Sequence, residues 1–225
     1  MSDPIEPAAL AARNNAEWCA AVCRTHDLDG AYAADAWTVA RRSPSFYPDA
    51  VTLRPAAGPD LLTRIDAGAG ASVKDSFAAL DLAGAGFTVL FDAEWLHRAP
   101  GGPAAVVRRP AVPVTTPAAL AGWAAAHGGG DVFRPGLLAD PTVTLLAMYD
   151  AEGAVAGGAA VNRTGPVAGV SNVFAVTATP DEVWAAVLDR FPDVPLVGYE
   201  SGADLAPPLR LGFRTVGPLR VWLRD

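Results

Sequence analysis

The sequence predicts an α/β protein with a mixed sheet, in which one structural unit occurs twice along the chain. Two observations lead to this fold class. Short apolar runs that fit buried strands alternate with segments whose apolar residues recur at helical spacing. In addition, a group of residues from the first half of the chain recurs about 125 positions later. The 225 residues are 51% apolar, which is enough to bury a sizeable core.

The last thirty or so residues show the clearest order of elements. Residues 196–199 form a short apolar run that predicts a buried strand. Because proline is tolerated in the first turn of a helix but not inside one, we expect a short helix that begins near Pro207. Gly212 can adopt the left-handed conformation that ends this helix. Residues 213–223 predict two strands joined at Gly217-Pro218.

The preceding residues complete an order that is typical of a known superfamily. The segments 117–126 and 132–138 predict two short helices, followed by strands over 142–149, 153–161 and 167–176 and a helix over 180–191. This order, with Leu211-Gly212-Phe213 at the end of the short helix, resembles the C-terminal half of the GNAT (N-acetyltransferase) superfamily. The resemblance covers roughly residues 115–225.

The first half of the chain carries a degenerate form of the same pattern. We expect a helix over 8–26, strands over 37–41 and 51–53, and a helix that Pro59-Asp60 opens. Three dipeptides then match later ones at offsets of 125, 126 and 127: Asp75-Ser76 with Glu200-Ser201, Gly86-Phe87 with Gly212-Phe213, and Trp95-Leu96 with Trp222-Leu223. The alternative is a coincidence in a chain that is rich in Ala, Gly and Pro.

We therefore expect two GNAT-like lobes in tandem, an N-terminal lobe over residues 1–110 and a C-terminal lobe over residues 111–225, packed through their C-terminal strands. A segment rich in Pro and Gly, residues 100–117, marks the boundary. Two lobes can pair within one chain as two copies pair in a dimer. A monomer is therefore expected, and a homodimer is left open.

Composition limits the partners. Seventeen basic and 24 acidic residues give a net charge of −7, and Lys74 is the only lysine. An acidic chain without a basic cluster predicts no binding to nucleic acid. No apolar run approaches the ~20 residues that span a bilayer, and the first residues are acidic where a secretion signal would be basic. We expect a cytoplasmic protein that acts on a small molecule, without a membrane partner.

Cysteine and histidine do not form a metal-ligand pattern. Cys19 and Cys23 are spaced to lie on one face of a helix, but a zinc site needs about four ligands. His26, His97 and His127 lie far apart in the sequence. We expect two buried thiols and no metal.

The resemblance implies acetyl-CoA as a possible donor, yet the phosphate-binding loop departs from the family pattern. GNAT proteins have Arg/Gln-x-x-Gly-x-Gly/Ala before a helix, whereas Val176-Thr-Ala-Thr-Pro-Asp-Glu182 has no glycine or arginine. Pro180 lacks an N–H group, and Asp181 and Glu182 would repel a phosphate. We expect any cofactor to bind through the preceding strand edge, at Val173, Phe174, Ala175, Val176, Thr177 and Thr179.

The expected catalytic residues also follow from the resemblance. The usual general acid, a tyrosine about four residues before Gly-Phe, is replaced by Pro208 and Leu82. The family often uses a glutamate as base on a central strand, which makes Glu200 and Asp75 the candidates, with Tyr199 beside the first. The alternative is that both carboxylates cap the turns that follow their strands.

Two functions therefore compete. The first is a GNAT-like acyltransferase with an altered phosphate loop, which transfers an acetyl group from acetyl-CoA to an amine of a small molecule. The second is a GNAT-fold protein that no longer uses CoA, either a pseudoenzyme, a binding or interaction protein, or a fold recruited to a different reaction.

Overall fold

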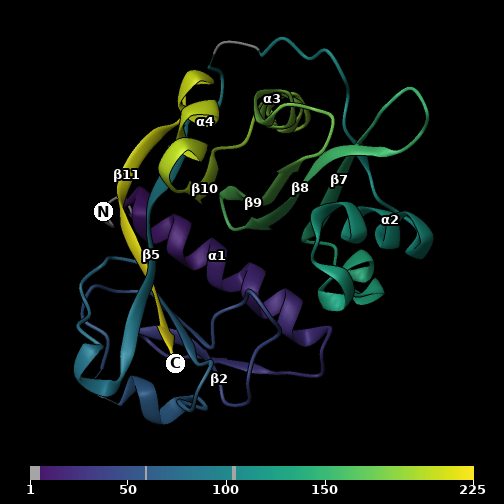
Figure 1. The fold of residues 1–225 in the computed structure, drawn as a ribbon. Helices are drawn as coiled ribbons and strands as arrows, with labels where there is room; N and C mark the ends of the chain where they lie inside the picture. The colour runs from purple at the N-terminus through teal and green to yellow at the C-terminus, as the bar shows by residue number, and fades with distance from the viewer. Residues whose placement is uncertain (1–5, 59, 103–104) are drawn as a thin grey trace.

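A computed structural model of the chain describes residues 6–58, 60–102 and 105–225. Within these residues, eleven strands form one mixed sheet in the order β1-β2-β3-β4-β11-β5-β10-β9-β8-β7-β6 (Figure 1). The sheet and the helices packed on it confirm the α/β class with a mixed sheet. The strands are β1 Gly30–Tyr32, β2 Ala36–Val39, β3 Ala50–Thr52, β4 Ser72–Asp75, β5 Phe87–Arg98, β6 Val112–Pro113, β7 Val143–Tyr149, β8 Val155–Thr164, β9 Val167–Ala175, β10 Leu196–Glu200 and β11 Arg214–Arg224.

The helices fall close to their expected positions. The α-helices are α1 Pro7–Arg24, α2 Pro117–His127, α3 Pro180–Arg190 and α4 Ala206–Arg210, and the 3-10 turns are η1 Leu61–Arg64, η2 Ala83–Ala85, η3 Gly130–Val132, η4 Pro135–Ala139 and η5 Gly202–Leu205. The helix expected over 132–138 is therefore wrong, because η3 and η4 replace it with two tight turns. Pro59, the expected start of the first-half helix, lies outside the described residues.

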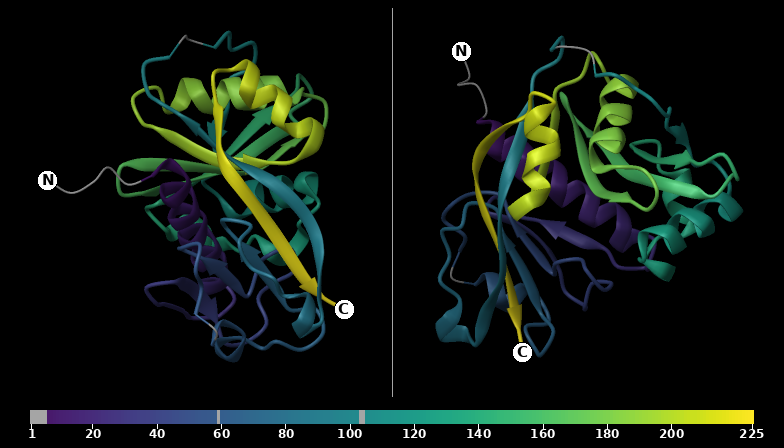
Figure 2. Two further views of the ribbon diagram at one scale, coloured as in Figure 1. Left: turned by 90° about the vertical axis from the view of Figure 1, so that its left-hand side faces the viewer. Right: turned by 45° about the horizontal axis from the view of Figure 1, so that its top comes forward.

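Helices α1 and α3 pack on opposite faces of strands β8 to β10 (Figures 1 and 2). Helix α1 crosses the molecule between the two halves of the sheet (Figure 1). Its Asn14 side chain donates to the carbonyl of Asn162 at 3.0 Å, and the Asn162 side chain donates to the carbonyl of Asn14 at 3.1 Å. This reciprocal buried pair satisfies both amides and fixes the position of the helix on β8.

The two long strands β5 and β11 run side by side and antiparallel through the centre of the sheet (Figure 2). Strand β11 lies between β4 and β5, and β5 lies between β11 and β10. Strand β11, from the second half of the chain, therefore lies next to strands β1 to β4, and strand β5, from the first half, lies next to strands β6 to β10. The division of the chain at residue 110 stays a prediction. If the chain is divided there, β5 of the first lobe pairs with β10 of the second lobe, and β11 of the second lobe pairs with β4 of the first.

The expectation of two strands joined at Gly217-Pro218 is wrong. Strand β11 is continuous, and its pairing with β5 has two irregular steps, between Thr215 and Gly217 and between Val221 and Trp222. Strand β4 pairs with β11 only from Arg220 onward, so no strand lies on that side of β11 at Pro218. A residue without an N–H group is tolerated at such a position, because one side of the strand needs no hydrogen bond.

Candidate functional site

Strands β9 and β10 are parallel neighbours that separate part of the way along their length. Three residue pairs join them, and the last pair is Val170 with Gly198. Just beyond this point β9 has a bulge, in which Asn172 and Val173 lie opposite the single residue Ala159 of β8. Asn172 has a φ of 52°, a conformation that asparagine adopts more readily than most residues. Because a bulge bends its strand, β9 turns away from β10 here.

The separation of the two strands leaves a cavity of about 190 Å³, which we call the β9–β10 cavity. Strand β9 forms one wall, strand β10 and turn η5 form the other, and the start of α3 covers it. The lining residues are Val173, Phe174, Ala175, Pro180, Trp184, Glu200 and Asp204. Three of the residues expected to bind a cofactor and one expected catalytic residue therefore line the same cavity.

Glu200 carries a carboxyl group whose surroundings in the cavity disfavour the charged form. Burial, together with the nearby carboxylate of Asp204, raises the pKa of its carboxyl to about 8. Among the described residues, none donates a hydrogen bond to Glu200, and the turn that follows has no side-chain cap at Ser201. Glu200 does not cap this turn, and its carboxyl is held partly protonated near neutral pH inside the cavity.

The other two expected catalytic residues lie elsewhere. Tyr199 points to the α1 side of the sheet, where its ring meets Trp95 edge-on at 5.6 Å between centroids. Asp75, at the end of β4, is fully buried and accepts hydrogen bonds from the N–H groups of Leu80 at 2.7 Å and Phe77 at 3.3 Å. The structure therefore brings neither Tyr199 nor Asp75 into the β9–β10 cavity, and Asp75 holds a turn together.

The backbone donors of the expected phosphate loop are already in use. The N–H groups of Val176, Thr177 and Ala178 all donate to the single carbonyl oxygen of Ala156, at 2.8, 3.1 and 2.9 Å. Thr179 and Glu182 then form a capping box, in which the Thr179 side chain accepts from the Glu182 N–H and the Glu182 carboxylate accepts from the Thr179 N–H. An anion at this position would have to displace these bonds.

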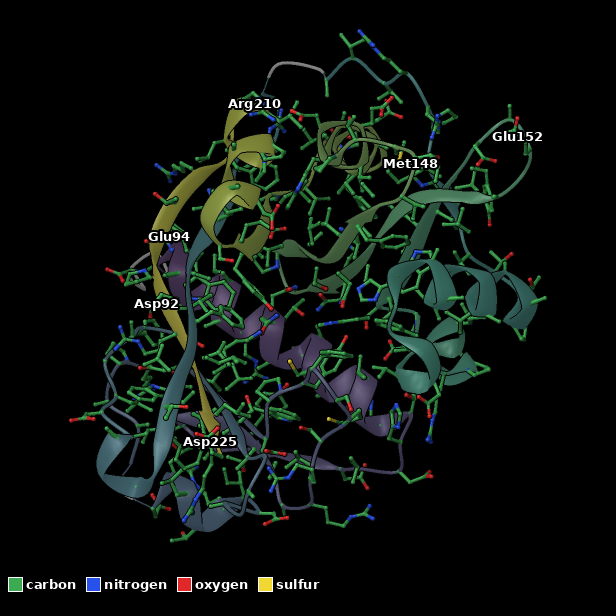
Figure 3. All side chains as sticks on the ribbon, viewed as in Figure 1. Asp92, Glu94, Met148, Glu152, Arg210 and Asp225 are labelled. Carbon is green, nitrogen blue, oxygen red and sulfur yellow. The ribbon has the colours of Figure 1, made fainter. Side chains whose placement is uncertain are left out.

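The start of α3 also carries two ionised acids. Arg210 on α4 (Figure 3) donates two hydrogen bonds to Asp181, at 2.9 and 2.6 Å, and this pairing lowers the pKa of the Asp181 carboxyl. The hydrogen bond from the Thr179 backbone lowers the pKa of Glu182. Both carboxylates are therefore charged at neutral pH, where they favour the helix start and oppose a phosphate.

Sequence reasoning missed two lining residues of the cavity. Asp204 raises the pKa of Glu200, and its position four residues further along the chain was a usable signal, since one helical turn follows the strand. Trp184 packs its ring edge-on against Phe213 at 5.0 Å and closes the cavity on the α3 side. Its place one turn into the helix after Pro180 could have indicated this.

Cys19 and Cys23 are both buried and outside any disulfide, as expected. Burial raises the pKa of the Cys19 thiol to about 11 and that of Cys23 to about 12, so both remain protonated. In the part of the chain that the structure describes, no group of three or more His, Cys, Asp or Glu side chains is arranged to hold a metal ion. None of the described helices has the length and apolar character that crossing a bilayer requires.

The fold is similar to that of solved structures described as GCN5-related or GNAT-family acetyltransferases. A solved structure described as a GCN5-related N-acetyltransferase from Kribbella flavida is similar over 96% of both chains, with a TM-score of 0.63 and 15% identity. A putative GNAT-family acetyltransferase from Novosphingobium aromaticivorans matches 95% of this chain and 99% of its own, with a TM-score of 0.59 and 15% identity. The likeness therefore extends through the first half of the chain, well beyond residues 115–225.

A third solved structure, a functionally unknown conserved protein from Staphylococcus epidermidis, matches 73% of this chain and 75% of its own, with a TM-score of 0.53 and 11% identity. No model of a known family matches the sequence, and no curated protein matches it. At these identities, what the chain shares with its structural neighbours is the fold.

Proposed function

We propose that the protein is a GNAT-like acyltransferase that transfers an acetyl group from acetyl-CoA to an amine of a small molecule. The observation that carries this proposal is the β9–β10 cavity, which lies where two parallel strands separate and contains a carboxyl with a pKa of about 8. The GNAT fold of the whole chain supports it.

The chemistry needs a group that takes a proton from the acceptor. An ammonium group is not nucleophilic, and it must lose a proton before its nitrogen attacks a carbonyl carbon. A base whose pKa is near the working pH is the most effective for this task. We assign this role to Glu200, whose carboxylate would accept the proton as the new C–N bond forms and the C–S bond of the thioester breaks.

The residues around the cavity fit the pantetheine arm of acetyl-CoA better than its pyrophosphate. Beyond Val170 no strand pairs with β9 on its β10 side, so Val173 to Ala175 offer backbone groups to an extended pantetheine arm. The start of α3 fits the pyrophosphate poorly, because the donors of Val176 to Ala178 are occupied. We therefore propose weak binding that depends on the strand edge and little on the phosphate loop.

The occupied donors favour a second candidate function. A GNAT-fold protein that has lost CoA binding would serve as a pseudoenzyme, as a binding or interaction protein, or in a different reaction. The capping box and the ionised Asp181 support this alternative, because both stabilise the bare helix start.

Several broader features belong to the same proposal. We propose a cytoplasmic monomer of two tandem lobes, without nucleic acid or membrane partners, since β5 and β11 already pair within one chain. The boundary near residue 110 and the exchange of last strands are parts of this description.

Thermal unfolding with and without ligand tests the first function against the second. A ligand that binds only the folded state at about ten times its Kd adds ~1.4 kcal/mol, which raises the Tm of a chain of this size by ~3–6 °C. We expect acetyl-CoA and CoA at millimolar concentration to raise the Tm, with ATP at the same concentration as the control anion. If neither acetyl-CoA nor CoA raises the Tm, the acyltransferase is excluded and the alternative function is favoured.

The Glu200→Gln variant tests the assigned base. It should bind acetyl-CoA as the wild type does, while its acetyl transfer to a panel of primary amines falls by about 10²-fold or more. Glu152→Gln, in the exposed turn between β7 and β8 (Figure 3), is the matched control and should retain full activity. Unchanged turnover in Glu200→Gln would show that Glu200 is not the base.

A further inference from the structure

The only lysine of the chain lies in a second, smaller pocket on the α1 side of the sheet. This Lys74 pocket has a volume of about 60 Å³. Its walls come from α1, β4, β9, β10 and the loop before β3, and the polar and aromatic residues that matter here are Asn15, Tyr47, Lys74, Ser171, Asn172 and Tyr199. Phe46, which is 86% exposed, stands at its rim.

Lys74 is buried without a carboxylate partner. Its side chain is 5% exposed, and its Nζ donates one hydrogen bond, to Oδ1 of Asn15 at 2.8 Å. The ammonium lies 4.2 Å from the centroid of the Tyr199 ring, a cation–π contact. Among the described residues no acid forms a salt bridge with it. A buried ammonium is costly unless it is paired, so its remaining donors call for an anion.

The groups that surround the ammonium are neutral, and several can donate. Burial raises the pKa of Tyr47 well above its usual value, which keeps its hydroxyl protonated. The Tyr47 hydroxyl donates to the side-chain oxygen of Asn172 at 3.5 Å, and the Asn172 amide donates to the Ser171 hydroxyl at 3.3 Å. Cys19, on the same wall, remains a thiol. Among the described residues no acid pairs with Lys74, and the Ser171 hydroxyl and the second N–H of the Asn172 amide remain as donors that can complete an anion site.

The Lys74 pocket adjoins the β9–β10 cavity. Ser171 and Asn172 line the pocket, and the next residue, Val173, lines the cavity. In the same way Tyr199 lines the pocket and Glu200 lines the cavity. Adjacent residues of a regular strand such as β10 point to opposite faces of the sheet, so Tyr199 and Glu200 lie on its two sides. The two spaces therefore lie on the two sides of the place where β9 and β10 separate.

We propose that the Lys74 pocket binds the carboxylate of the acceptor, so that the substrate is a small amine that also carries a carboxylate, as amino acids do. The inference rests on the proposed function. One ammonium matches a monoanion, the volume holds a carboxylate group, and the walls contain no arginine fork of the kind that grips a phosphate. With its carboxylate at Lys74, the acceptor would direct its amine toward the separation of the strands and Glu200.

Three matched probes test the proposal by ligand-observed NMR, independently of turnover. Propionate carries only the carboxylate, propylamine only the amine, and β-alanine both. We expect propionate and β-alanine to bind the wild-type protein and propylamine to bind much more weakly, at a constant chloride concentration. Lys74→Met keeps the length of the side chain and removes its charge. It should weaken propionate by about ten- to a hundredfold, since a charge-assisted hydrogen bond contributes ~1.5–3 kcal/mol.

The stability of the same variant separates a binding role from a structural one. Removing an unpaired buried charge should leave the Tm of Lys74→Met unchanged or raised. A lowered Tm with unchanged propionate affinity would make Lys74 structural and overturn the proposal. If Lys74→Met does not fold, Asn172→Gly keeps the left-handed backbone and removes one wall, and it should weaken propionate several-fold. Equal affinity in that variant would also count against the pocket.

Failure of this inference is distinguishable from failure of the proposed function. If acetyl-CoA binds but propylamine is acetylated with the same KM as β-alanine, the acyltransferase stands and the carboxylate pocket falls. If propionate binding depends on Lys74 while acetyl-CoA does not bind, the carboxylate site is supported and acetyl-CoA is wrong as the acyl donor. Under the proposal, Lys74→Met raises the KM for β-alanine and leaves the Kd of acetyl-CoA unchanged.

Discussion

The parallel strand pairs β3/β4 and β9/β10 occupy matching places in the sequence repeat and differ in one respect. The pair β3/β4 is closed beyond its last paired residues, because the side chain of Thr52 accepts a hydrogen bond from the N–H of Ser76 at 2.8 Å. The pair β9/β10 separates and encloses a cavity. Asp75 and Glu200, which the predicted repeat aligns, end β4 and β10, so the same position holds a turn in one pair and lines a cavity in the other.

Side-chain length and the following turn account for the difference. After β4 the backbone folds back tightly, with Ala78 at a φ of 49°, and its N–H groups surround the short carboxylate of Asp75. After β10 the chain continues into η5 without a side-chain cap, and the longer side chain of Glu200 reaches the cavity instead. A carboxylate at a strand end is therefore a turn cap wherever the next residues can bend around it.

The largest effect is expected where the comparison assigns a structural role. Asp75→Ala removes a fully buried acceptor from two partly buried N–H groups, those of Leu80 and Phe77. Each unsatisfied buried donor costs ~1–3 kcal/mol, so we expect a loss of about 2–4 kcal/mol in the free energy of unfolding. Urea unfolding at neutral pH measures it. Asp81→Ala, whose carboxylate bonds one exposed N–H, is the control. A loss below 1 kcal/mol would contradict the structural role of Asp75.

The next effect concerns pH and Glu200. Its pKa rises from 4.5 to about 8 on folding, so the unfolded chain loses this proton before the folded protein does. Stability therefore falls as pH increases from 4.5 to about 8, by at most ~1.4 kcal/mol per pH unit from this group, and then levels off. Glu200→Gln should remove this slope and be more stable than the wild type at pH 8. Unfolding between pH 5 and 9 measures it, with Glu152→Gln as the control that keeps the slope.

The smallest effect concerns the phosphate loop beside the cavity. Replacing Asp181 by Asn and Glu182 by Gln removes two negative charges from the start of α3, releases Arg210, and leaves the cap in place because glutamine also forms a capping box. Each charge contributes ~0.3–1 kcal/mol, so CoA should bind a few-fold to about tenfold more tightly. Calorimetric titration measures it, and Asp189→Asn near the end of α3 should change nothing. Unchanged affinity would move the phosphate site away from α3, with residues 54–58 as the next candidate.

The order of elements could be predicted from the sequence, and the pairing of strands could not. Apolar periodicity and the Leu-Gly-Phe segment placed α3, β10, α4 and the beginning of β11 within a few residues, because these signals are local. The predicted repeat aligned the segments that form β5 and β11, but an alignment does not say which strand each one joins. The exchange of β5 and β11 depends on contacts between residues more than a hundred positions apart.

The same contrast between local signals and long-range contacts decides which parts of the candidate site could be predicted. The position of Glu200 at the end of a strand could be predicted from the local pattern, whereas its candidacy as a base came from the resemblance and stays a prediction. The Lys74 pocket was not, because it joins Asn15, Lys74 and Tyr199, which are distant in sequence and meet only in the folded protein. The departure of the phosphate loop from the family pattern was visible in the sequence, whereas the occupation of its donors by Ala156 required the structure.

The exchanged strands have a consequence for how the chain is made. A nascent chain that has left the ribosome only as far as β10 has no partner for the free edge of β4 and lacks one neighbour for β5. Unpaired strand edges template aggregation, and contacts between distant residues slow folding. The sheet of the first half is completed only when β11 arrives. Strands β4 and β5 therefore obtain their last neighbour only after β11 has been translated.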